Sequence, residues 1–414
     1  MFIKHLLALV LGAVIAVPLS AQDFDKGLAA YVAGDHKTAL KEWRPLAERG
    51  RAGAQYFLGR SFYYGDGVPK DSKAAFEWFE LAAEQGHAEA QTSLGWMYEY
   101  GEGVSQDLAK AIKWYNLAVQ RDNAAAQRNL GMMYDLGKGV PEDDEEALKW
   151  YALAAKQGDV VAQYNLGVMY HSGESVLQDH AKGIKWIKSA AEQGSTLAQK
   201  YLGWMYGMGE GVPKDLDQAA KWYRLAAEQG DPEAQTNLGL MYKNGVGVSQ
   251  DFAKAIKWHT LAAEQGNAEA QFNLGVMYNL GEGVPQDNKE AAKWYRFAAE
   301  QGDTHAQVIL GSMYSLGNGL NQDKNEAVKW YSLAAERGNA GAQIQLGFAY
   351  RLGDIFPQDF ILALMWFNLG TANGDEAGRE RIENLEKKMS SEDIAKAQAM
   401  AKKCVNTNYQ DCGF

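Results

Sequence analysis

The side chains best suited to recognising another molecule recur at one position of a 36-residue period. Two of them, Trp96 and Trp204, are tryptophans, which are enriched among the anchors of protein interfaces. The position reads Arg60, Trp96, Met132, Val168, Trp204, Leu240, Val276, Ser312 and Phe348, and the position four residues earlier supplies Tyr56, Tyr164, Phe272 and Ile344. We interpret these side chains as a binding surface. Because a stripe at helical spacing is ordinarily core, burial against neighbouring helices is the competing interpretation.

Asparagine amides form a second candidate set. They share the position directly before a repeated Leu-Gly pair, at Asn129, Asn165, Asn237 and Asn273. A buried amide needs hydrogen-bond partners in any case, which favours a structural bond to the next hairpin over a contact with a ligand.

No arrangement of residues indicates catalysis, a metal or a cofactor. The histidines are scattered over unrelated repeat positions, and neither a Ser-His-Asp nor a Cys-His set can be assembled from the spacing. The Gly-x-Gly loops lack the Gly-Lys-Ser/Thr ending of a phosphate-binding loop and follow no strand. The acidic run 142–146 suits the start of a helix, with a cation site as the weaker alternative. We therefore expect a protein that is not an enzyme and carries no cofactor.

Each period is predicted to form two helices, and the candidate binding side chains lie on the first of them. Residues 267–302 illustrate the unit. Each helix places apolar residues on one stripe, which comprises Ala270, Leu274, Met277 and Tyr278 in the first and Ala291, Trp294, Tyr295, Ala298 and Ala299 in the second. Asp287 follows a glycine-rich turn and is placed to cap the second helix. Gly302 can adopt the left-handed conformation that ends this helix, and Asp303 can cap the next one. The unit is predicted to be a helix hairpin.

Nine such hairpins are predicted in strict register, at 51–86, 87–122, 123–158, 159–194, 195–230, 231–266, 267–302, 303–338 and 339–374. A period of this length indicates a stacked array in which neighbours share a core. Residues 22–50 are predicted to form a shorter capping hairpin with a Gly34-Asp35 turn. In 375–414 we expect two helices that cover the apolar end of the ninth hairpin, with a capping box at Ser390 and Asp393 between them.

The charge balance is acidic, with 41 Lys and Arg against 52 Asp and Glu and a formal net charge of −11. A protein that binds nucleic acid concentrates basic residues on one face, so this balance argues against such a partner. Acidity instead favours solubility of a long array.

The first 21 residues read as a cleaved signal peptide. Lys4 precedes an apolar run from Leu6 to Val17, and Pro18 to Ala21 offer a cleavage point. An uncleaved membrane anchor is the alternative, but a membrane span needs about 20 apolar residues. No other apolar run in the sequence is long enough to cross a bilayer. Export would allow Cys404 and Cys412, the only cysteines, to form a local disulfide, with intermolecular pairing as the alternative.

The repeated pattern A-x-A-Q-x-x-L-G-x-M-Y-x-x-G-x-G-V-x-x-D-x-x-x-A-x-K-W-Y-x-x-A-A-E-Q-G resembles the Sel1-like repeat, the longer-looped relative of the tetratricopeptide repeat. The resemblance covers residues 51–374 and weakly 22–50. It implies an all-α fold, a superhelical solenoid of α-hairpins. Tetratricopeptide proteins bind through the concave side of the first helix of each hairpin, which in the seventh unit corresponds to Glu269, Phe272, Val276, Asn279 and Leu280. Asparagine beside Leu-Gly can bind the backbone or a carboxylate of a peptide in those relatives.

The resemblance implies an exported bacterial scaffold, periplasmic or secreted, that binds a protein or peptide on its concave face. One alternative is an enzyme acting on cell-wall or β-lactam compounds, as proposed for cysteine-rich Sel1-like proteins. The present repeats lack the paired cysteines of those proteins, which weakens this transfer. The other alternative is a scaffold for envelope or polysaccharide assembly, in which the aromatic stripe meets sugar or an outer-membrane partner.

Overall fold

A computed structural model describes residues 23–173, 177–353, 355–409 and 412. Within these residues the regular secondary structure consists of 22 helices and no strand. The chain divides into two compact units, with the boundary between Ser195 and Thr196. None of the described helices is long and apolar enough to cross a membrane. The predicted signal peptide lies outside the described residues.

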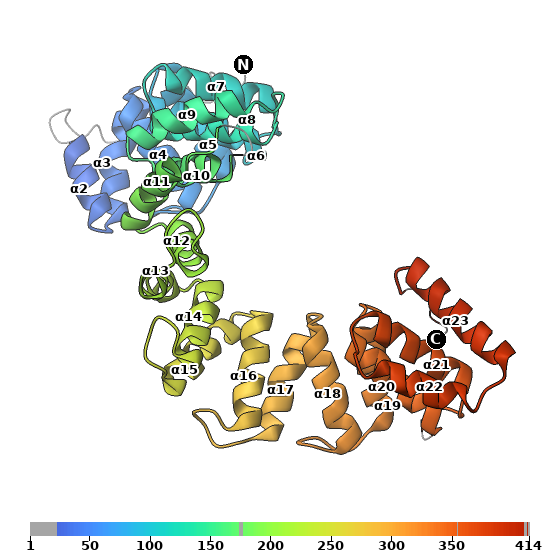
Figure 1. Ribbon diagram of the computed structural model, residues 1–414. Helices are drawn as coiled ribbons and strands as arrows, with labels where there is room; N and C mark the ends of the chain where they lie inside the picture. The colour runs from blue at the N-terminus through green and yellow to red at the C-terminus, as the bar shows by residue number, and fades with distance from the viewer. Residues whose placement is uncertain (1–22, 174–176, 354, 410–411, 413–414) are drawn as a thin grey trace. The chain divides into compact units, whose positions relative to one another are not determined.

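The first unit is a succession of helix hairpins, each helix packing against the next (Figure 1). Its helices are α2 (Phe24–Val32), α3 (His36–Glu48), α4 (Ala52–Tyr64), α5 (Ser72–Glu84), α6 (Ala88–Tyr100), α7 (Leu108–Val119), α8 (Ala124–Asp135), α9 (Asp144–Lys156), α10 (Val160–Ser172) and α11 (His180–Glu192).

The second unit repeats the same hairpin and ends with two further helices. Its helices are α12 (Thr196–Met208), α13 (Leu216–Glu228), α14 (Pro232–Asn244), α15 (Phe252–Glu264), α16 (Ala268–Leu280), α17 (Asn288–Glu300), α18 (Thr304–Leu316), α19 (Lys324–Ala335), α20 (Ala340–Leu352), α21 (Phe360–Ala372), α22 (Gly378–Glu386) and α23 (Ser391–Asn406).

Capping fixes where the helices begin and end. Asp287 accepts hydrogen bonds from the backbone N–H groups of Lys289 and Glu290 at 2.9 and 3.0 Å, which satisfies donors that the first turn of α17 leaves free. The predicted aspartate caps are confirmed in all nine repeats, at Asp71, Asp107, Asp143, Asp179, Asp215, Asp251, Asp287, Asp323 and Asp359. Gly302 has a φ of 94°, as predicted for the end of this helix.

The glycine of each Leu-Gly pair lets the two helices of a hairpin approach closely. A Cβ atom added to Gly95 would lie 2.5 Å from the ring of Tyr115 on α7, and one added to Gly203 would lie 2.7 Å from the ring of Tyr223 on α13. Carbon atoms do not approach so closely, so glycine is required for the aromatic ring to fill this position.

A buried glutamine ties each hairpin to the one before it. Gln235 on α14 donates a hydrogen bond from Nε2 to the carbonyl of Ala227 on α13 at 3.1 Å, and its Oε1 accepts from Gln265 of its own hairpin at 2.9 Å. The bond to the preceding alanine carbonyl recurs at Gln55, Gln91, Gln163, Gln271, Gln307 and Gln343. Because buried polar groups need partners, these amides fix the register between successive hairpins.

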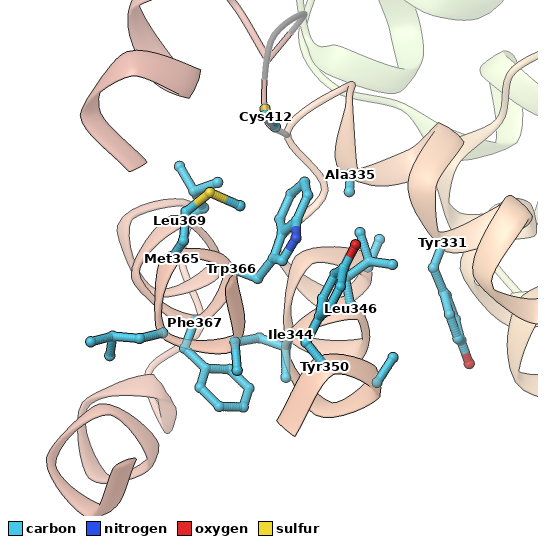
Figure 2. Close-up of a cluster of buried hydrophobic side chains, with 14 of the residues drawn as sticks. Tyr331, Ala335, Ile344, Leu346, Tyr350, Met365, Trp366, Phe367, Leu369 and Cys412 are labelled. Atoms are coloured by element: carbon cyan, nitrogen blue, oxygen red, sulfur yellow. The ribbon is translucent and has the colours of Figure 1, made fainter. Parts of the chain in front are cut away.

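The helices α22 and α23 cover α21, as expected for 375–414. Trp366 and Phe367 of α21 are buried with Leu346 of α20, and Figure 2 shows Trp366 between these two helices. Leu385 and Ala397 of the two final helices belong to the same core. Ser390 caps α23 as predicted, because its hydroxyl accepts from the backbone N–H of Asp393 and donates to the Asp393 carboxylate. Cys404 and Cys412 form a disulfide.

Candidate functional site

A cavity of about 600 Å³ opens in the first unit on the first helices of three successive hairpins, α4, α6 and α8. Four of the predicted residues line it, namely Tyr56 and Arg60 from α4, Trp96 from α6 and Asn129 from α8. The other lining residues are Tyr63, Tyr64, Phe79, Glu89, Thr92, Ser93, Met97, Asn123, Ala125 and Arg128.

The helical period explains why these side chains converge. Tyr56 and Arg60 lie one turn apart on α4, and Tyr63 and Tyr64 follow about one turn later on the same side. The 36-residue period then brings Trp96 to the register of Arg60 on the next first helix. The opposite side of each first helix carries the alanine, leucine and methionine residues that fill the core. The cavity therefore lies on the face that does not pack within the hairpin.

Aromatic rings form one wall of the cavity. The rings of Tyr63 and Trp96 have centroids 5.7 Å apart and meet edge to face, and Trp96 lies 4.8 Å from Tyr100 in a tilted stack. Lys138 lies over Tyr100 at 4.3 Å and pairs with the buried carboxylate of Glu99 at 2.8 Å. Because these contacts fix the position of the Trp96 ring within the protein itself, the aromatic wall is in place before a ligand binds.

Arg60 is a charged residue of the cavity and lies among a second group of aromatic rings. Its guanidinium carbon lies 5.7 Å from the ring centroids of Tyr31, Phe57 and Tyr64 and 5.9 Å from that of Tyr56. These distances are typical of cation–π contacts. Within the described part of the chain, no carboxylate forms an ion pair with Arg60.

The second arginine of the cavity is already neutralised. Arg128 forms an ion pair with Asp159 at 2.9 Å and donates from Nε to Oδ1 of Asn129 at 3.1 Å. Glu89 contributes a carboxylate, which contacts Nδ1 of His87 at 3.2 Å and is 57% exposed at its side chain. Arg60 is thus a half-buried charge of the cavity that forms no ion pair with a carboxylate of the described residues.

The hydroxyl groups around the cavity are neutral at physiological pH. Burial raises the pKa of Tyr56, and Arg60 lowers it in part. Burial also raises the pKa of Tyr63, as does the charge of Glu102. Burial lowers the pKa of His87, against the opposing effect of Glu89, so this imidazole is neutral at pH 7. The tyrosines can donate hydrogen bonds but supply no nucleophile.

The second unit contains two smaller cavities that also use predicted residues. One, of about 300 Å³, is lined by Trp204, Asn237 and Leu240 among others. The other, of about 400 Å³, is lined by Phe272 together with His305, Val308, Ile309, Asn339, Ala340 and Gly341. Trp204 is 40% exposed, the most open of the tryptophans at the variable position.

The remaining predicted residues are not among those that line these three cavities. Met132 packs against the buried cluster around Tyr151, Val276 packs against the cluster around Tyr295, and Phe348 lies 5.3 Å from the ring of Phe367. Ile344 is buried at 5% exposure, whereas Tyr164 and Val168 are half-buried. The stripe is thus neither uniformly core nor uniformly surface.

Asn129 and Asn165 contact the preceding hairpin, not the next one. Asn129 and Asn165 lie beside the hydroxyl groups of Tyr115 and Tyr151, whose pKa values burial raises and these amides lower slightly. Asn273 is half-buried, as is Asn165. Asn129 and Asn237 in addition border cavities, so a structural contact and a place at a binding surface are compatible.

Sequence reasoning missed Arg128, Thr92 and Glu89, although a signal for them existed. Arg128 and Thr92 hold the register position of Tyr56, which we searched only for large apolar side chains. Glu89 shares the register of Glu269, which the tetratricopeptide comparison had indicated. Reading every residue type at these positions would have found all three.

Helix hairpins in register, joined by a repeated glutamine and packed through a repeated glycine, define an all-α solenoid. The Sel1 repeat pattern matches nine consecutive segments, 52–87, 88–123, 124–159, 160–195, 196–231, 232–267, 268–303, 304–339 and 340–375. The chain therefore belongs to the Sel1 repeat family. Repeats of this family generally mediate protein–protein interactions and are typically non-enzymatic.

Two solved structures are similar over most of the chain. A protective antigen present in uropathogenic Escherichia coli strains, which displays an SLR fold, has 32% sequence identity over 94% of this chain and 92% of its own, with a TM-score of 0.60. A Sel1 repeat protein from Oxalobacter formigenes has 35% identity over 81% of this chain and 97% of its own, with a TM-score of 0.56. No curated protein matches the chain.

Proposed function

We propose that this protein is an exported scaffold that binds a protein partner through the first helices of its hairpins, with the cavity on α4, α6 and α8 as its principal contact site. The observation that carries the proposal is the preformed aromatic wall of that cavity, built from Tyr63, Tyr64 and Trp96 around Arg60. Tryptophan, tyrosine and arginine are the residues that most often anchor protein interfaces.

Two further features support the proposal. Repeats of the Sel1 family generally mediate protein interactions. Export to the periplasm or the cell exterior agrees with the pairing of Cys404 and Cys412, because disulfides persist in oxidising compartments.

Site-specific photocrosslinking tests this function. A photoreactive amino acid replaces Ser93, which lines the cavity on α6, in the full chain produced in its native cells. The matched control places the same group at Leu153, a 38% exposed residue on the second helix α9. We expect a discrete protein adduct from position 93 and none from position 153.

Equal labelling from both positions, or no protein adduct from position 93, would overturn the proposal. A Trp96→Ala change in the crosslinking chain provides a second readout. It should reduce the adduct while the far-UV circular dichroism spectrum stays unchanged, since Trp96 is half-buried and packs against the cluster around Phe79 and Leu94 without being one of its fully buried members.

A further inference from the structure

The chemistry of the partner can be read from the charge that the cavity leaves unsatisfied. Arg60 sits among four aromatic rings without a carboxylate partner in the described part of the chain, whereas Arg128 in the same cavity has Asp159. A guanidinium group that is partly withdrawn from water gains most from a carboxylate, because the two planar groups form parallel hydrogen bonds.

The aromatic wall of the cavity indicates which side chain of the partner lies beside that carboxylate. Tyr63, Tyr64 and Trp96 present apolar ring surface on the same side as Arg60. The ring centroid of Tyr64 lies 5.7 Å from the guanidinium carbon of Arg60. The rings of Tyr64 and Tyr63 have centroids 4.9 Å apart, and Trp96 lies 5.7 Å from Tyr63, so an apolar wall runs from Arg60 to Trp96. An extended peptide rises about 3.3 Å per residue, so a side chain two to three residues from the acidic one lies about 7–10 Å further along this wall.

We infer that the cavity on α4, α6 and α8 binds an acidic peptide segment, in which an Asp or Glu pairs with Arg60 and an aromatic or large aliphatic side chain within three residues packs on Trp96 and Tyr63. This inference rests on the proposed function and specifies the partner of that same site.

The polar groups of the cavity favour a peptide over an anionic polysaccharide. The single hydroxyl hydrogen of Thr92 is shared between the Ala88 carbonyl and Oδ1 of Asn123, and the Ser93 hydroxyl donates to the Glu89 carbonyl. Asn129 accepts from Arg128. One ring face of Trp96 is already engaged by Tyr100. Sugar recognition needs many hydroxyl partners and open ring faces, whereas an apolar side chain with one carboxylate needs neither.

Glu89 limits where the negative charge can lie. Its carboxylate borders the cavity but is well solvated, with 57% of the side chain exposed, and it would repel a second acidic residue placed near it. The acidic residue of the partner must therefore lie on the α4 side of the cavity, and a neutral or basic residue is expected on the side of Glu89.

Selection from a phage-displayed library of linear nine-residue peptides tests the inference on the full chain. The variants are Arg60→Gln, Trp96→Ala and, as a matched loss of one positive charge, Lys113→Gln at an exposed position of α7. We expect enriched peptides to carry Asp or Glu within three residues of an aromatic or large aliphatic residue. R60Q should abolish the acidic preference and keep the apolar one, and K113Q should change neither.

A synthetic peptide from the selection and its Glu→Gln or Asp→Asn counterpart then give the magnitude of the acidic preference. The chain should prefer the acidic form by roughly ten- to a hundredfold in Kd, with R60Q losing this difference and Arg60→Lys retaining part of it. The preference should shrink as salt is raised. Unchanged thermal unfolding midpoints of the variants show that they are folded.

The outcomes separate this inference from the proposed function. Peptides that are enriched without acidic residues, or whose acidic preference survives R60Q, overturn the inference and leave a protein-binding site. Absence of any peptide that depends on Trp96 overturns both. Binding of alginate, a polyanionic polysaccharide, that is lost in R60Q while no peptide is enriched, overturns the inference in favour of a sugar ligand.

Discussion

His259 occupies a position on α15 at which five other repeats carry a tyrosine, namely Tyr115, Tyr151, Tyr223, Tyr295 and Tyr331, and three carry Phe79, Ile187 and Phe367. The ring is fully buried, and neither of its nitrogens has a hydrogen-bond partner among the described residues. Burial, with a smaller effect from the charge of Lys243, lowers the pKa of His259 to about 4. An imidazole in this setting is held neutral at pH 7, and charging it inside the core is costly.

The buried imidazole predicts a pH-dependent stability. The unfolded chain binds a proton at this residue below about pH 6.5, whereas the folded chain does so only near pH 4. Stability is therefore complete above about pH 6.5 and is lost as the pH falls toward 4, by up to about 1.4 kcal/mol per pH unit. Urea unfolding of the chain and of His259→Tyr between pH 7.5 and 4.5 measures this. The variant should lose stability less steeply on acidification; parallel curves would contradict the assignment.

Two glycines of α12 are predicted to respond to alanine with stability changes of opposite sign. Gly203→Ala places a Cβ atom 2.7 Å from the Tyr223 ring, and we expect a net loss of roughly 1–2 kcal/mol in the free energy of unfolding. Gly207→Ala, in the same helix, meets its nearest atom at 3.8 Å and should gain up to about 1 kcal/mol through helix propensity. The denaturant midpoints of the two variants, compared with that of the unchanged chain, test both signs. Equal effects would show that propensity alone governs these positions.

At the scale of helices, the array is held by contacts that repeat with the period. Each first helix receives a side chain of the second helix against its glycine, which is a ring in most hairpins and Ile187 in one. It also sends a glutamine amide to the preceding hairpin, as Gln235 illustrates. Aspartate caps start the second helices, so the boundaries follow from local hydrogen bonding. Packing and capping thus recur at equivalent positions in successive hairpins. The stability of each hairpin therefore depends on the contacts with its neighbours.

The glutamine contact predicts a local loosening between hairpins. Gln235→Ala removes two hydrogen bonds, one to the Ala227 carbonyl and one from the Gln265 amide, which should cost about 1–3 kcal/mol in total at about 0.5–1.5 kcal/mol each. The Ala227 carbonyl keeps the backbone N–H of Gly230 as a donor, and the Gln265 amide keeps the Leu261 carbonyl. The control is Gln250→Ala, because Gln250 makes a similar bond to the Lys243 carbonyl at an exposed position, where water can replace it. Hydrogen exchange should show reduced protection at the end of α13 in Q235A only. Similar exchange in the two variants would contradict the prediction that burial makes the Gln235 bond more important than the exposed Gln250 bond.

At the scale of the whole molecule, stability is a sum of hairpin terms and nearest-neighbour interfaces. A perturbation at one end should therefore stay near that end. The helices α22 and α23 and the disulfide close the core around Trp366 in the second unit (Figure 2). The acidic net charge of −11 is spread over many repeats and favours solubility without marking a site.

Removal of the disulfide tests this locality. Replacing Cys404 and Cys412 by serine releases a short loop, which should cost about 2–3 kcal/mol in local stability. Hydrogen exchange should lose protection in α23 and in the part of α21 that it covers, while α4 to α8 keep theirs. A uniform loss along the chain would show instead that the array unfolds as one cooperative unit.

The sequence by itself determined the elements and their order. The period, the aspartate caps and the Leu-Gly pairs are local or strictly repeated signals, and capping and helical periodicity act within a few residues. Hairpin formation and membership of the Sel1 family could therefore be predicted from positions such as Asp287 and Gly302. The tail helices followed for the same reason, from Ser390 and the spacing of apolar residues after it.

Only the tertiary structure decided which members of the variable stripe border open space. Arg60, Trp96 and Met132 hold the same register, yet Arg60 and Trp96 line a cavity and Met132 does not. Trp96 and Met132 each also pack against a core cluster. The difference depends on the volumes of side chains contributed by three helices at once, and no periodic signal encodes that sum. The isolation of Arg60 from carboxylates and the pairing of Arg128 with Asp159 are likewise set by distances between hairpins. Recognition lies in those non-repeated contacts, because the repeated ones are used to build the fold.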